Sequence, residues 1–264
     1  SGLSPNTLYD FYVADNCDTN VATGPFTFKT ACLNQLTGAY TVGSSTADFT
    51  TLSDAILALG CGITGPVTLN LQGGSHSAIS LGLIPGANAT NTVTINGSAN
   101  LGDSIIATGQ TAGIDLDGTQ YISFNGLYVE NTTGNFVVWM HNGSSHLNFD
   151  GCTLASSTTT TLAANSVFVA SALGTSPTSY GDNVSHVSLK NSHIVGGYYG
   201  IVLNGTSTAL KTRGIEISGN TIESSYYYGL RIYYGDSAII EGNSIPDGMR
   251  NTASYGIYMY YVDN

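Results

Sequence analysis

A repeated eight-residue pattern constrains the fold of this chain more than any other feature of its sequence. The pattern places apolar residues at its first, third and last positions, with glycine or asparagine at or near its centre. A repeat of roughly 20–30 residues, with short alternating strands and Gly or Asn at the corners, is typical of a β-solenoid. We therefore expect stacked turns of short strands. The repeat occurs as ISFNGLYV, LNFDGCTL, VSLKNSHI, IEISGNTI and AIIEGNSI, beginning at residues 122, 147, 187, 215 and 238.

A second, shorter apolar segment lies between these repeats. Aligning its Tyr-Gly pairs places Tyr199, Tyr228 and Tyr255 in one column. Adjacent strands are about 4.8 Å apart, so side chains at equal positions should form ladders. The segments are GIDL at 113, YGIVL at 199, YGLRI at 228 and YGIYM at 255, with weaker versions FVVW at 136 and VFVA at 167.

One helix is predicted ahead of the repeats, near residues 50–59. Leu52, Ala55, Ile56 and Leu59 fall at i, i+3, i+4 and i+7, which is one face of a helix. Such a short helix needs another element to pack on. We expect it to cover the first turn of the solenoid.

Residues 1–32 have a different pattern. The segments TLYDFYVADN and GPFTFKTAC alternate apolar and polar residues and are joined by a polar stretch, which predicts a β-hairpin. Two strands alone are not stable. The segments GLSPNTLYDFYV and GPFTFKT resemble the last two strands of an immunoglobulin-like, fibronectin type III domain. The resemblance implies that residues 1–32 are the truncated carboxy-terminal part of such a sandwich.

Residues 33–264 resemble the right-handed parallel β-helix repeat proteins. The rungs with Gly219–Asn220 and Gly242–Asn243 carry this resemblance. The opening GAYTV…DFTTLSDAILALGCGITGPVTLNL resembles the start of such domains in large secreted, adhesin-like surface proteins of Bacteroidetes-type bacteria. Adhesins, polysaccharide lyases and esterases share this fold, so the fold does not give the activity. We expect the β-helix to continue beyond Asn264, because YGIYMYYV would leave an apolar strand face open.

Composition excludes several classes of function. Only 9% of residues are charged and the net charge is −11, with six Lys and Arg in total. A nucleic-acid binder or a polybasic membrane anchor needs a basic face, so neither class is expected. No apolar run approaches the roughly 18 residues of a spanning helix, so we expect no membrane insertion.

Four cysteines are too few for a disulfide scaffold of this length. Cys17 and Cys32 would lie near opposite ends of the predicted hairpin, too far apart to bond. We expect a disulfide between Cys32 and Cys61, each just outside a regular element, which leaves Cys17 with a partner upstream. Cys152 falls on an inward position and is predicted to be a buried thiol.

Tyrosines gather near the carboxy-terminal end of the sequence. Alternation points Tyr258 and Arg231 outward, and Tyr233 and Tyr260 extend the strand ends. Tyrosine offers a flat apolar face with a polar tip, which suits a sugar ring. The alternative is a structural ladder, since aromatic neighbours on adjacent strands stabilise each other. The candidate ligand-binding residues for a glycan or another surface are Tyr233, Tyr234, Tyr258, Tyr260 and Arg231.

Candidate catalytic and metal-binding residues are sparse. Asp115 and Asp117 lie two apart on one strand face, and Asp150 is expected to form a surface ion pair with Lys190. The five histidines are interpreted as residues of turns or strand surfaces, and no HExxH motif occurs. We assign no catalytic residue, metal ligand or cofactor from the sequence, and leave open a calcium ion at the DLDG turn.

The sequence therefore favours a non-enzymatic role. We expect a segment of a large secreted adhesin or extracellular fibre, a stiff rod that contacts glycans or surfaces through its tyrosine-rich flank. Its partners would be those glycans or surfaces and neighbouring modules of the same chain or filament. Two alternatives remain: a β-helical polysaccharide lyase or glycoside hydrolase, and a purely structural filament subunit.

Overall fold

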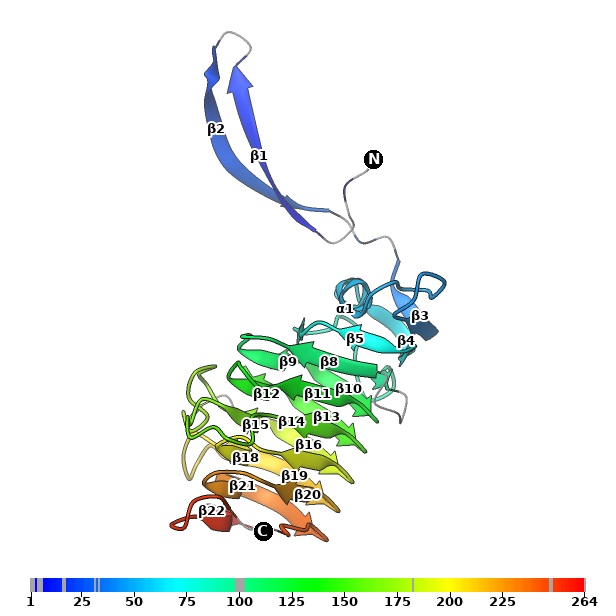
Figure 1. The fold of residues 1–264 in the computed structure, drawn as a ribbon. Coiled ribbons are helices and arrows are strands. Elements are labelled where there is room, and N and C mark those ends of the chain that lie inside the picture. The colour runs from blue at the N-terminus through cyan, green and yellow to red at the C-terminus, as the bar shows by residue number, and fades with distance from the viewer. Residues whose placement is uncertain are drawn as a thin grey trace.

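The chain forms a parallel coil preceded by a separate hairpin (Figure 1). In each full turn of the coil the chain passes through three parallel sheets. The pairings between the coil's described strands are parallel, which confirms the predicted all-β stack of rungs. The structure is a computed structural model that describes residues 3, 7–15, 18–30, 32, 34–97, 103–181, 183–246 and 249–263.

The three sheets are built from strands that recur in the same order along the chain. The first sheet contains β3 (Leu36–Val42), β4 (Ile63–Leu71), β7 (Val93–Asn96), β10 (Gln120–Asn125), β13 (Ser145–Asp150), β16 (Ser185–Lys190) and β19 (Thr212–Ser218). The second contains β6 (Ile79–Leu81), β9 (Ala112–Asp117), β12 (Phe136–His141), β15 (Ser166–Ala170) and β18 (Tyr199–Asn204). The third contains β5 (Gly74–His76), β8 (Asp103–Ala107), β11 (Tyr128–Asn131), β14 (Thr153–Ala155), β17 (His193–Val195) and β20 (Thr221–Glu223).

The last two described strands are long and join the first two sheets. The first half of β21 (Tyr228–Glu241) pairs with β18, and its second half pairs with β19. The last strand, β22 (Tyr255–Asp263), pairs with β21.

The register predicted from the eight-residue repeat is confirmed in the first sheet. The first apolar residues of the five repeats are consecutive partners: Ile122, Leu147, Val187, Ile215 and Ala238. Because side chains alternate across a strand, this register sends one apolar column inward from every rung. The rings of Phe124 and Phe149 stack in the interior with centroids 4.7 Å apart.

The predicted helix is present as α1 (Leu52–Leu59), and it lies at the amino-terminal end of the coil (Figure 1). Its Leu52, Ala55 and Leu59 side chains are buried in the same core as the first rungs. The hydroxyl of Thr51 caps the helix by accepting a hydrogen bond from the amide of Asp54. The helix therefore covers the apolar end of the stack.

The hairpin consists of β1 (Leu8–Asp15) and β2 (Asp18–Lys29), paired antiparallel. Its apolar side chains, including Leu8, Phe11 and Phe26, are exposed.

The two cysteines expected to pair, Cys32 and Cys61, are joined by a disulfide with Cα atoms 5.3 Å apart. Cys17, expected to pair upstream, lies outside the described residues.

Candidate functional site

The tyrosine columns predicted from the second repeat are present in the second sheet. Tyr199, Tyr228 and Tyr255 are consecutive partners, and Tyr233 lies beside Tyr260. The rings of Tyr199 and Tyr228 stack at 5.5 Å with an interplanar angle of 19°. The ladder interpretation is therefore correct for part of this group.

Other tyrosines connect these columns into one surface. Tyr258 stacks on Tyr228 at 5.2 Å and on Tyr260 at 6.4 Å, so aromatic contact runs across the outer side of β21 and β22. Tyr234 stacks on Tyr261 at 5.3 Å. We call this region the tyrosine surface; it comprises Tyr180, Tyr228, Tyr233, Tyr234, Tyr255, Tyr258, Tyr260 and Tyr261.

Part of the tyrosine surface is open to solvent. Tyr180, Tyr255, Tyr260 and Tyr261 are exposed, whereas Tyr199, the first ring of the ladder, is buried. Partial desolvation and a hydrogen bond with Tyr180 raise the pKa of Tyr233 to about 12. The Tyr233 phenol therefore stays protonated at ordinary pH and can donate a hydrogen bond.

Arg231 departs from the expectation of a surface residue. It lies in the outward column, paired with Val202 and Tyr258, but only 7% of it is exposed. Its guanidinium donates to the Asn204 side chain and lies 4.8 Å from the centre of the Tyr233 ring. The Asn204 amide in turn donates to the carbonyl of Pro177, so the segment 171–181 lies over this part of the sheet.

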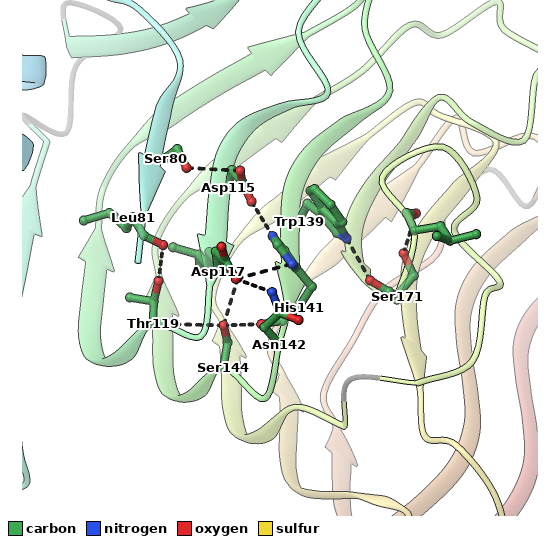
Figure 2. A network of polar contacts seen from close by, with 12 residues as sticks. Ser80, Leu81, Asp115, Asp117, Thr119, Trp139, His141, Asn142, Ser144 and Ser171 are labelled. Carbon is green, nitrogen blue, oxygen red and sulfur yellow. Dashed lines mark hydrogen bonds and ion pairs between the residues drawn. The ribbon is translucent and has the colours of Figure 1, made fainter. Parts of the chain in front are cut away.

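A polar network that the sequence did not predict lies on the same outer face, nearer the amino-terminal end (Figure 2). Nε2 of His141 lies 2.8 Å from Oδ1 of Asp115, and Nδ1 lies 3.7 Å from Oδ1 of Asp117. Ser80 donates to the other oxygen of Asp115, and Asn142 donates to Asp117. One imidazole thus lies between two carboxylates of the neighbouring rung.

The ends of β9 and β12 hold this network in place. The hydroxyl of Ser144 lies 2.8 Å from the carbonyl oxygens of both Leu116 and His141, which share its one proton, and it accepts from the amide of Thr119 (Figure 2). All three hydroxyl contacts are buried. These contacts of the Ser144 hydroxyl link the turn after β9 to the turn after β12, and they therefore fix how the two turns lie relative to each other.

Trp139 forms one wall of the network. Its indole stacks on the imidazole of His141 at 3.7 Å, and its Nε1 donates to the carbonyl of Ser171. A Cβ added at Gly174 would lie 3.0 Å from the indole, so the segment 171–181 packs on this ring as well. The indole therefore anchors this segment.

The chemistry available to the network is limited by its hydrogen bonds. Ser80 donates to Asp115 and not to His141, so the imidazole is not placed to deprotonate this hydroxyl as a nucleophilic triad requires. Residues two apart on one strand face are roughly 7 Å apart, within the carboxyl spacing of inverting glycosidases. The ring of His141, however, lies between the two carboxylates.

A signal for this network is present in the sequence. Alternation places Asp115 and Asp117 on one strand face, whereas the sequence predicts His141 only as a residue of a turn or strand surface. Aligning GIDLDG on VVWMHN pairs Asp117 with His141, as the structure does. The weak repeat at residue 136 gave too little similarity to fix that register.

Two other predicted placements need correction. Lys190 pairs with Glu216 at 2.8 Å, whereas Asp150 accepts a hydrogen bond from Asn191, so the predicted Asp150–Lys190 ion pair is wrong. His76 and His141 are buried, not on a turn or strand surface. The prediction for Cys152 is confirmed: it is a free, buried thiol, and burial raises its pKa to about 11.

Within the described ranges, no group of three or more His, Cys, Asp or Glu side chains is arranged to hold a metal ion. The same part of the chain contains no helix with the length and apolarity that a membrane crossing requires.

Comparisons with known proteins concern the fold. Residues 180–264 match a family model described as a right handed beta helix region. No curated protein sequence matches the chain. Together with the parallel topology, the match confirms the predicted right-handed parallel β-helix.

Solved structures with a similar fold are distant in sequence. The crystal structure of YbhC from Escherichia coli is 10% identical with a TM-score of 0.53, over 95% of this chain and 90% of that one. The pectin methylesterase from Aspergillus niger is 16% identical with a TM-score of 0.47, over 88% of this chain and 86% of that one. At these identities the likeness concerns the fold alone.

Proposed function

We propose that this chain is a non-enzymatic, glycan-contacting segment of a large secreted surface protein. The tyrosine surface carries the proposal. Its exposed rings lie on β22 and at Tyr180, and they contact half-buried tyrosines of the adjacent strand β21, so a sugar would meet preordered aromatic side chains. Tyrosine combines apolar contact area with a hydrogen-bonding tip at a low cost in side-chain entropy.

Secretion is part of the same proposal. The disulfide between Cys32 and Cys61 supports it, because disulfides persist mainly in oxidising, extracellular compartments. The hairpin supports a modular protein. Its exposed apolar side chains would be covered if it belonged to a fibronectin type III-like sandwich.

The experiment replaces Tyr233, Tyr258 and Tyr260 by Ala together. Retardation of the folded protein in gels containing neutral or acidic polysaccharides measures binding. We expect the variant to lose at least tenfold in affinity for any glycan that retards the parent chain. The matched control replaces Thr68, Thr94 and Ser123, which lie side by side on the outer face of the first sheet. Equal retardation of the parent and the tyrosine variant would overturn the proposal.

A hydrolase is the second candidate, favoured by the pair Asp115 and Asp117. It predicts that new reducing ends appear when polysaccharides are incubated with the protein. Asp115→Asn and Asp117→Asn should then each abolish their release. A parent chain that releases none from a panel of acidic and neutral polysaccharides excludes this candidate for those substrates.

A further inference from the structure

Two exposed histidines lie face to face at a corner near the start of two neighbouring strands of the first sheet, β13 and β16. His146 and His186 belong to consecutive rungs, since their neighbours Ser145 and Ser185 are strand partners. The two imidazole rings are 4.5 Å apart with an interplanar angle of 10°. The ring of Tyr121, one rung earlier, stacks on the other side of His146 at 4.3 Å.

The corner itself holds these rings in register. Tyr121, His146 and His186 have φ values of 56°, 55° and 52°. The next rungs repeat the left-handed conformation at Gly214 and Ser237, so it belongs to the corner and not to a strained site. A Cβ at Gly214 would lie 3.0 Å from Cδ2 of His186. Glycine therefore lets the second imidazole pack against the backbone of the following rung.

Imidazole nitrogens are ligands for borderline divalent transition metals. Nδ1 of His146 lies 3.3 Å from Oγ of Ser145. When that nitrogen donates its proton to the hydroxyl, Nε2 keeps a free lone pair. With metal–nitrogen bonds of about 2.0–2.1 Å, two nitrogens in a tetrahedral site are about 3.3 Å apart. An imidazole lone pair lies in the ring plane, so both exposed rings must turn out of their stack about their side-chain torsions to point these two nitrogens at one ion.

The other histidines are less available to a metal ion. His141 contacts two carboxylates, His193 lies 3.0 Å from Glu223, and His76 is buried. The charged neighbour on the next rung, Arg213, is paired with Asp236 at 3.4 Å.

We propose that His146 and His186 form a surface site for Cu²⁺, Ni²⁺ or Zn²⁺, with water completing the coordination. Two protein ligands make the site reversible and weaker than a closed structural zinc site. The site is independent of the tyrosine surface, which lies on the second sheet.

The test is a titration of the whole chain with CuSO₄, followed by the ¹H NMR signals of the five histidine rings. Paramagnetic broadening should appear first at His146 and His186. His146→Gln and His186→Gln should each lower Cu²⁺ affinity at least tenfold by calorimetry, whereas His193→Gln should leave it unchanged. Broadening that begins at His141 or His193, or parental affinity in both variants, would overturn the proposal. The broadening pattern of the parent chain decides the matter even if a variant folds poorly.

Discussion

The two ends of the β-helix are covered to very different extents. At the amino-terminal end, the Leu59 side chain of α1 packs into the core and is completely buried (0% exposed). At the other end, Ile257 and Met259 of β22 are 45% and 52% exposed, although they continue inward columns whose previous members, Leu230 and Ile232, are buried. The strands β21 and β22 carry the same apolar pattern. A column position is therefore buried only when another layer lies over it.

The largest expected effect compares the two ends directly. Leu59→Ala should destabilise the protein by about 3 kcal/mol, because it leaves a cavity under the capping helix. Ile257→Ala should cost under about 1 kcal/mol, since the isoleucine side chain is already half in water. Urea unfolding followed by circular dichroism measures both. Similar losses at the two ends would show that β22 is covered in solution.

The disulfide tests whether the capped end depends on a covalent link. Cys32 and Cys61 are 29 residues apart in sequence, and closing a loop of this size contributes at most about 3.6 kcal/mol in the chain-entropy model. A double Cys→Ser variant should have a lower melting temperature. Hydrogen exchange should quicken in α1 and stay unchanged in β21. Faster exchange in β21 would contradict a local role.

The helix cap gives a smaller change at the same end. Thr51→Ala removes the hydroxyl that accepts a hydrogen bond from the amide of Asp54. This substitution should lower the free energy of unfolding by about 1 kcal/mol. Ser53→Ala, at an exposed position one residue into the helix, is the matched control and should have little effect. Chemical denaturation measures the free energy of unfolding of both variants. Equal stabilities of the two variants would show that the cap is unimportant.

The smallest effect on stability is expected for the ion pair of Lys190 and Glu216, which lies on the body of the coil between its two ends. A hydrogen bond from Lys190 lowers the pKa of Glu216 below its usual value of 4.5. The pair therefore stabilises the folded state above pH 4.5, and its contribution is lost as the pH falls through the lowered pKa. Because both side chains are about one-third exposed, the contribution should be below about 1 kcal/mol.

Glu216→Gln tests this pH dependence. Its stability difference from the parent should be present at pH 7 and shrink steadily as the pH falls below 4.5. A difference that grows on acidification would mean that the carboxylate is destabilising in the folded protein.

Much of the fold could be predicted because a solenoid repeats one local rule. The Gly or Asn corners and the alternating apolar residues predict which side chains face inward. Equal positions within the eight-residue pattern predict the register of the strands from Ile122 to Ala238. The same reasoning placed Tyr199 beside Tyr228 and Tyr233 beside Tyr260. These contacts depend only on alternation and on the stacking of like positions.

Only the tertiary structure decided what lies over the outward columns. Arg231 is outward by alternation, yet contacts from the segment 171–181 reach its partner Asn204 and the ring of Tyr233. The network of Asp115, His141 and Asp117 needed a register that the weakest repeats do not carry. Alternation specifies a direction for each side chain, but burial and hydrogen bonding depend on chain segments that arrive from elsewhere in the sequence.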